Sequence, residues 1–118
     1  MVVTRRLTTL AIVLIPVMGL AGGLAGNRAF AGDLVAGKAK AEAACQVCHG
    51  IDGRATEAMV ANLSGQQKEY MVAQLEAYRA GQRQHQQMSI IAQMLSDDDI
   101  ENVAEWYSSI KITIEMPN

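Results

Sequence analysis

The stretch Ala44-Cys45-Gln46-Val47-Cys48-His49-Gly50 decides how the rest of this 118-residue chain can fold. Cys45 and Cys48 are the only cysteines, and on a forming helical turn they present both sulfurs to the same side. Each sulfur can then add to a vinyl group of a porphyrin, which gives two thioether bonds. His49 follows directly, so its imidazole can bind the iron as proximal ligand. The C-x-x-C-H pattern therefore predicts one covalently attached haem c.

Three other chemistries use cysteines at this spacing. A redox dithiol should follow a buried strand, but the residues before Cys45 are rich in alanine and favour a helix. A zinc site could combine both cysteines with His49 and His85, although the adjacent ligands Cys48 and His49 strain a tetrahedral arrangement. A disulfide between the cysteines would close a very short loop and stabilise little. The motif favours haem attachment over all three.

Residues 1–31 are expected to be a cleaved secretory signal peptide. Two arginines precede an apolar run from residue 7 to residue 24, and Ala29-Phe30-Ala31 forms an A-x-A cleavage site. The run is long enough for a membrane anchor, but Pro16 and several glycines make it a poor spanning helix. We therefore expect a periplasmic protein with a single domain, residues 32–118.

The expected mature chain is short and acidic. Residues 32–118 carry seven basic and twelve acidic side chains, a net charge of −5 with neutral histidines. This charge disfavours nucleic acid and anionic membranes as partners. A chain of this length buries only a small core, and a haem would supply the apolar bulk that its few aromatic residues do not.

The first two helices are predicted from composition and periodicity. Residues 33–44 are rich in good helix formers, and Gly37 among them suggests close approach of another helix or a plain surface position. In the second segment Met71, Leu75 and Tyr78 recur at helical spacing, which makes Met71 a core residue. Ser64-Gly65-Gln66-Gln67 predicts a capping box at its start, and Gly81 stands where it should stop.

A third helix should begin at Ser96, a hydroxyl N-cap followed by three aspartates that complement the helix dipole. Its apolar stripe consists of Ile100, Val103, Ala104, Tyr107 and Ile110, with Trp106 at the edge. Residues 50–64 and 82–95 are predicted to be loops, the second leading to the distal side of the haem. Residues 111–118 alternate like a strand that has no partner, which predicts an extended tail on the domain or a docking strand for a partner subunit.

The segments described above resemble a class I c-type cytochrome, in particular a single haem domain of the cytochrome c4 and bacterial c553 type. The resemblance covers nearly all of residues 32–118. It rests on the following segments in order: Cys45-Gln46-Val47-Cys48-His49-Gly50, Asp52-Gly53, Leu63-Ser64-Gly65-Gln66, Gln74-Leu75, Tyr78-Arg79-Ala80-Gly81 and Leu95-Ser96-Asp97-Asp98-Asp99-Ile100. It implies an all-α class I cytochrome c fold with about three main helices around one haem.

The resemblance also implies the distal iron ligand. In this family the ligand methionine lies seven residues before the leucine of the Leu-Ser-Asp segment, which is Met88 here. The other candidates for this position are Met59, Met71, Met94, Met116 and His85. The family usually has a proline whose carbonyl orients the proximal histidine, and Ala61 replaces it in this chain, which keeps the carbonyl but loses the fixed φ.

The sequence thus predicts a periplasmic monohaem cytochrome that carries single electrons, with His49 and Met88 as axial ligands. Two strong ligands leave no open position at the iron, so we expect no enzymatic activity at the haem. Its partners would be redox proteins, with a dehydrogenase as donor and an oxidase, reductase or photosynthetic complex as acceptor. The alternatives are a haem subunit fixed in a sulfur-compound or flavin dehydrogenase complex, and a gas-binding or peroxidase-like haem protein.

Overall fold

The computed structural model describes residues 32–118, and the expected signal peptide lies outside the described residues. Five helices follow one another: α1 (Leu34–Ala44), α2 (Gln46–His49), α3 (Lys68–Arg79), α4 (Met88–Gln93) and α5 (Asp97–Ser109). Residues 32–118 contain no strand, and α1, α3 and α5 are the three long helices, as predicted. Within the same residues, none of the helices combines the length and apolar character needed to cross a membrane.

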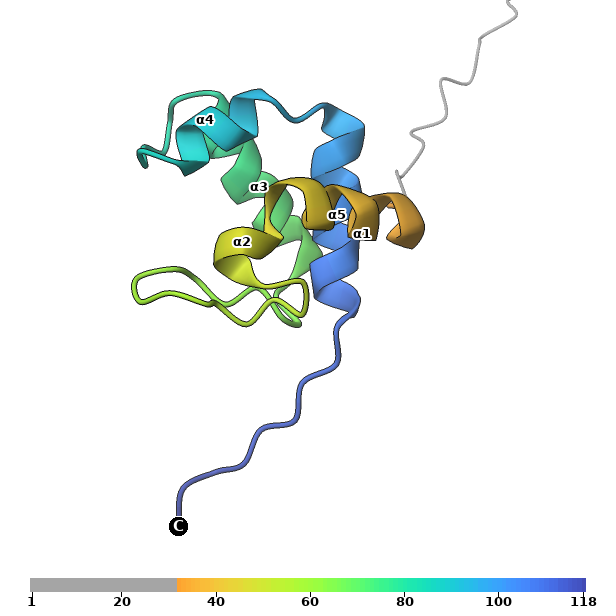
Figure 1. The fold of residues 1–118 in the computed structure, drawn as a ribbon, viewed down its shortest axis with the longest axis vertical. Helices are drawn as coiled ribbons and strands as arrows, with labels where there is room; N and C mark the ends of the chain where they lie inside the picture. Colours follow the sequence, from red (N-terminus) through yellow and green to blue (C-terminus); the bar gives the residue numbers. More distant parts are fainter. Residues whose placement is uncertain (1–31) are drawn as a thin grey trace, which may run out of the picture.

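The first and last helices, α1 and α5, cross each other and pack together (Figure 1). Gly37 is buried at the crossing, where a Cβ atom would collide with the backbone carbonyl oxygen of Asn102. The N-cap residue of α1, Asp33, accepts from the amides of Val35 and Ala36, and its own amide donates to Asn102 Oδ1 at 2.7 Å. Of the two interpretations of Gly37, close helix approach is therefore confirmed.

The small core lies where α1, α3 and α5 meet. Its central cluster takes Ala41 from α1, Met71 from α3, and Ala104 and Tyr107 from α5, all at most 6% exposed. α3 packs against both α5 and α4, so it connects the crossing of α1 and α5 to the short helix α4. The prediction that Met71 is a core residue is confirmed.

Two local predictions were wrong. Ser64 does not cap α3: the N-cap residue is Gln67, which makes no side-chain capping bond, and Ser64 Oγ instead donates to the carbonyl of Asp52 at 2.7 Å. The serine closes the preceding loop, and this role competes with helix capping. The segment predicted as a loop before Ser96 also contains the six-residue helix α4.

The predicted cap of α5 and the predicted end of α3 are confirmed. Ser96 and Asp99 form a capping box in which each side chain accepts from the other residue's amide at 3.1 Å. Gly81 follows the C-cap residue of α3 with a φ of 74°, a conformation that favours glycine.

The C-terminal segment, residues 111–118, is extended and exposed throughout. Ile112 lies close to Gly65, and beyond it the chain runs away from the helices (Figure 1). The prediction of an extended segment is confirmed, but most of it does not lie on the domain as expected. Three apolar side chains on it are exposed: Ile112, Ile114 and Met116.

Candidate functional site

The two cysteines lie at the junction of α1 and α2. Cys45 is the residue between the helices, and its amide donates to the carbonyl of Ala41 at 2.9 Å, which continues the hydrogen bonding of α1. The amide of His49 in turn donates to the carbonyl of Cys45 at 3.0 Å. The motif therefore forms the helical turn that the sequence predicted, and both cysteines are free thiols in residues 32–118.

The environment of Cys45 is unlike that of a redox-active dithiol. Cys45 packs against the core cluster. Burial raises the pKa of its thiol to about 11, against a smaller opposing effect of the Lys40 charge. Reactive cysteines of redox enzymes instead have a lowered pKa, because the thiolate is the nucleophile. The environment of Cys45 therefore argues against the thioredoxin-like alternative.

The alternative of a zinc site has no assembled ligand set in the described part of the chain. Among residues 32–118, no three side chains of histidine, cysteine, aspartate or glutamate converge closely enough to hold a metal ion. His85 lies in the α3–α4 connection, where it is hydrogen bonded to the start of α4. The zinc alternative thus lacks the ligand set that it requires.

The imidazole of His49 is oriented by the backbone of the loop that follows it. His49 Nδ1 lies 2.8 Å from the carbonyl oxygen of Ala61, and because a carbonyl only accepts, Nδ1 carries the proton. Nε2 is then the unprotonated nitrogen, the form that can bind a metal. Ala61 provides this bond although it stands where the family usually has proline, since the bond uses the carbonyl and not the side chain.

The last helix fixes the end of the motif through two aromatic side chains. Tyr107 donates its hydroxyl to the carbonyl of Gly50 at 3.0 Å, and Trp106 Nε1 donates to the carbonyl of Ile51 at 3.0 Å. Burial raises the pKa of Tyr107, and the nearby Cys45 and Asp52 add to the effect, so the phenol stays a neutral donor. The helical periodicity placed Tyr107 on an apolar stripe with Trp106 at its edge, and did not predict their hydrogen bonds to the motif.

The side chain and backbone of Thr56 hold the middle of the motif. Thr56 Oγ1 lies within hydrogen-bonding distance of the carbonyls of Val47 and Cys48, at 2.9 and 3.1 Å, and the Thr56 amide donates to the Cys48 carbonyl at 3.0 Å. Gly50, which directly follows His49, has a φ of 73° and is buried. The chain therefore turns at Gly50, and the loop that follows returns to bond with α2 through Thr56.

The distal candidates occupy different environments. Met88 is the first residue of α4 and is half-buried, whereas Met71 belongs to the core cluster. Met59, Met94 and Met116 are 101%, 68% and 81% exposed. In Figure 1, α4 and α2 lie on the same side of α5, with α4 above α2, so Met88 and His49 come from two helices on that side.

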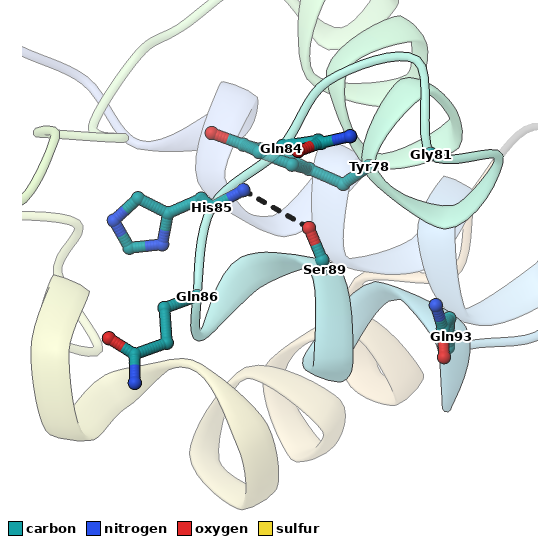
Figure 2. Close-up of a pocket in the computed structure, with 7 residues that line it drawn as sticks. All are labelled: Tyr78, Gly81, Gln84, His85, Gln86, Ser89 and Gln93. Atoms are coloured by element: carbon teal, nitrogen blue, oxygen red, sulfur yellow. Dashed lines mark hydrogen bonds between the residues drawn. The ribbon is translucent and has the colours of Figure 1, made fainter.

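His85 lies in the connection between α3 and α4, at an open hollow beside Tyr78. The hollow is lined by Tyr78, Gly81, Gln84, His85, Gln86, Ser89 and Gln93 (Figure 2). The amide of His85 donates to Ser89 Oγ at 3.1 Å, and the amide of Met88 donates to His85 Nδ1 at 3.3 Å. One ring nitrogen of His85 is therefore engaged with the backbone of Met88.

The sequence of this chain matches a known protein family. The family model described as "Cytochrome c" matches residues 34–111, and the chain belongs to this family. It is a class I c-type cytochrome of the c4 type, with the all-α fold of that class.

Two relatives differ in how much of their own length matches this chain: nearly all of the first and about a third of the second. Cytochrome c-554(548) of Halomonas halodenitrificans is 43% identical over 82 residues, which cover 67% of this chain and 98% of the relative. The thiosulfate dehydrogenase electron acceptor of Stutzerimonas stutzeri is 38% identical over 69 residues, which cover 56% of this chain and 32% of that protein.

A solved structure shows the same fold. The crystal structure of reduced recombinant cytochrome c4 from Pseudomonas stutzeri superposes with a TM-score of 0.63 at 34% identity, covering 69% of this chain. The chain spans 47% of that cytochrome c4, so it corresponds to about half of the longer protein.

The residues present fit the cofactor of the family. Two free thiols lie on one helical turn, and the next side chain is an imidazole whose Nδ1 is engaged by a backbone carbonyl, which leaves Nε2 for a metal. This donor set suits a covalent haem. The chain is thus a c-type cytochrome, an electron-transfer protein that carries covalent haem c with iron and acts with redox partners.

Proposed function

We propose that this protein is an exported, periplasmic one-electron carrier with a single haem c. Cys45 and Cys48 form the thioethers, His49 is the proximal ligand and Met88 the distal ligand. A thioether ligand favours ferrous iron, so this pair raises the reduction potential relative to two imidazoles. With both axial positions filled by the protein, the iron exchanges electrons without binding a substrate.

The observation that carries the proposal is the bond between His49 Nδ1 and the Ala61 carbonyl, 2.8 Å long. Metal-binding histidines commonly donate their other ring N–H to such a partner, which fixes the tautomer and the ring orientation. His49 has this arrangement directly after the two cysteines. Met88 is favoured because the core cluster takes up Met71 and because Met88 stands at the family's ligand position.

The test of the ligand pair compares Met88→Ala with His85→Ala. In ferric Met88→Ala the weak far-red sulfur-to-iron charge-transfer band should vanish, the reduction potential should fall, and the reduced protein should bind carbon monoxide. His85→Ala should keep the band, nearly the same potential, and a reduced iron closed to carbon monoxide. Reversed behaviour of the two variants would overturn the His/Met assignment. Carbon monoxide binding by the unmodified reduced protein would favour the gas-binding alternative.

Export is tested by the mass of the intact protein. Cleavage after Ala31 and attachment of one haem should give the mass of residues 32–118 plus one haem. A purified protein that still begins at Met1 would contradict both the cleavage and the proposed free periplasmic form.

We further propose that the carrier associates transiently with redox proteins that present a basic surface, because residues 32–118 carry a net charge of −5. Electrostatic steering raises the association rate and weakens as ionic strength rises. The rate of electron transfer to the physiological partner should therefore fall as salt is added. A rate that ignores salt would point to a permanent, mainly apolar interface.

A second candidate is a haem subunit fixed in a dehydrogenase complex. Two observations favour it: the similarity to a protein named as a thiosulfate dehydrogenase electron acceptor, and the exposed C-terminal segment with Ile112, Ile114 and Met116. Size-exclusion chromatography of the native protein separates the candidates. A free carrier elutes as a small monomer, and a subunit elutes with its dehydrogenase.

A further inference from the structure

In the connection between α3 and α4, His85 forms two hydrogen bonds to the start of α4, one as acceptor and one as donor. The amide of His85 donates to Ser89 Oγ at 3.1 Å (Figure 2). The amide of Met88 donates to His85 Nδ1 at 3.3 Å. The N-cap residue, Gln87, makes no side-chain capping bond. His85 therefore takes the place of the missing cap.

This arrangement acts on the backbone of Met88 itself. The first amides of a helix have no partner within the helix and need one from outside. The Ser89 amide donates to the carbonyl of His85 at 3.0 Å, so the side chain and the backbone of His85 together satisfy the first two amides of α4. A helix of six residues is marginal without such help, since most helical stability comes from tertiary contacts and caps.

The His85 ring is in turn attached to the core. Its centroid lies 6.5 Å from that of Tyr78, in an edge-to-face arrangement with an angle of 71° between the ring planes. Tyr78 is 8% exposed on α3, and the guanidinium of Arg83 covers its ring, with Cζ 4.7 Å from the centroid. A continuous series of contacts thus leads from α3 through His85 to the residue that begins α4.

We propose that His85 is a positioning residue for Met88: its Nδ1 holds the backbone from which the distal sulfur reaches the iron. The proposal rests on the proposed assignment of Met88 as distal ligand. It gives the imidazole a role in place of iron ligation, with Nδ1 as acceptor and the ring proton on Nε2. Loss of the acceptor should leave methionine as the ligand but let its loop open more often.

Three substitutions separate the acceptor from the ring. His85→Asn keeps an acceptor at the corresponding position of the side chain, because Asn Oδ1 and His Nδ1 are both bonded to Cγ, but it removes the ring. His85→Phe keeps a ring beside Tyr78 and removes the acceptor. His85→Ala removes both, and Gln86→Ala is the matched control, since Gln86 is an exposed neighbour in the same connection.

The measurement is the rate at which added imidazole displaces the distal ligand of the ferric protein at pH 8, with the far-red band recorded first. His85→Ala and His85→Phe should react about fivefold faster, the factor expected when a helix cap worth about 1 kcal/mol is lost. His85→Asn and Gln86→Ala should react like the unmodified protein. The rate of hydrogen exchange at the Met88 amide, read by NMR, should rise in His85→Ala and His85→Phe.

The outcomes separate this inference from the ligand assignment. If the unmodified protein lacks the far-red band, the assignment of Met88 fails. If the band is present and all variants react like the unmodified protein, the positioning role of His85 fails while the ligand pair stands. If His85→Phe reacts slowly and His85→Asn fast, the ring contact with Tyr78 fixes the loop, and the role of Nδ1 is overturned.

Discussion

Ala61 contributes to the proposed haem site through its backbone alone. Its carbonyl accepts from His49 Nδ1, while its side chain takes no part in the bond. The fixed φ of a proline would lower the flexibility of this segment. In this chain the two residues after Ala61 are held by hydrogen bonds instead: Asn62 Oδ1 accepts from the Ala55 amide at 2.8 Å, and the Leu63 amide donates to the Gly53 carbonyl at 2.7 Å. The loop therefore presents the carbonyl without the proline.

Tyr107→Phe should lower the free energy of unfolding of the holoprotein by about 1–2 kcal/mol. The Tyr107 hydroxyl donates to the Gly50 carbonyl in a buried position, and phenylalanine would remove this bond and leave the carbonyl with only the Gly53 amide, 3.1 Å away, as donor. Denaturant unfolding measures the difference.

Tyr70→Phe is the matched control for this change. Tyr70 is 49% exposed, so its hydroxyl is solvated and its loss should cost little. Equal effects of the two substitutions would contradict a specific role for the Tyr107 bond.

The roles of residues that belong to a local sequence pattern could be predicted. The roles of residues that depend on a hydrogen bond to a distant part of the sequence could not. The haem motif, the core position of Met71 and the stop at Gly81 each follow from short-range spacing. The bonds of Trp106 and Tyr107 join residues 55 and 57 positions apart, and no periodicity shows which carbonyl an aromatic side chain will reach. The polar hydrogens of a Trp–Tyr pair on an otherwise apolar stripe were the one available signal that such partners exist.

At the scale of helices, the contact between α1 and α5 depends on Gly37. Gly37→Ala would favour the isolated helix by about 1 kcal/mol, but the added methyl group has to displace the Asn102 carbonyl. Overpacking of this kind costs about 1–3 kcal/mol, so we expect a net loss of stability in denaturant unfolding.

The control for Gly37→Ala is Ala39→Ser, which adds one atom at an exposed position of the same helix. It should change the unfolding free energy only slightly. A Gly37→Ala variant that is more stable than the unmodified protein would show that the helices can separate at no cost.

The start of α5 should be sensitive to acid. Burial alone would raise the pKa of Asp99, but hydrogen bonds from Ser96 and the charge of Lys40, 3.0 Å away, outweigh it and lower the pKa. A carboxyl group whose pKa is lower in the folded state stabilises the fold above its unfolded pKa of about 4, and this contribution is lost as the pH falls.

Asp99→Asn should therefore lower the unfolding free energy at pH 7 by about 1 kcal/mol and have a smaller effect at pH 3. Asp98→Asn, at an exposed neighbouring position in the same turn, is the control and should show less of this pH dependence. Urea unfolding at both pH values measures the differences. An Asp99 effect that is equally large at pH 3 would contradict the role of the charge.

The long helices were predictable because helix-favouring composition marks α1 and apolar stripes mark α3 and α5, whereas α4 has neither signal. α3 and α5 have such stripes, and α5 also has its capping box. α4 is too short for a periodicity, and its start is formed by His85, a residue that is not typical of caps. Ser64 had the right pattern for a cap but bonds to Asp52 instead, because a serine hydroxyl can serve either a helix or a turn.

For the molecule as a whole, we expect folding to depend on the cofactor. Only nine apolar side chains of residues 32–118 are buried, a small core for a domain of this size. Replacing both Cys45 and Cys48 with alanine prevents covalent attachment and should leave a chain with little helical circular dichroism. Val47→Ala, at a 79% exposed position between the cysteines, is the control and should fold with its haem. A compact, helical double variant would show that the protein core suffices.

The crossing of α1 and α5 also affects the order in which the domain can be completed during synthesis. The helix that leads into the haem motif packs on a helix that begins at Asp97, and Asp33 is hydrogen bonded to a residue 69 positions further along the chain. A nascent chain that ends at Gln93 already contains both cysteines and both proposed iron ligands, yet it lacks the surface on which its first helix rests. The two ends of the domain must therefore meet after the ribosome has made nearly all of it, and contacts within the first half cannot assemble the fold in advance.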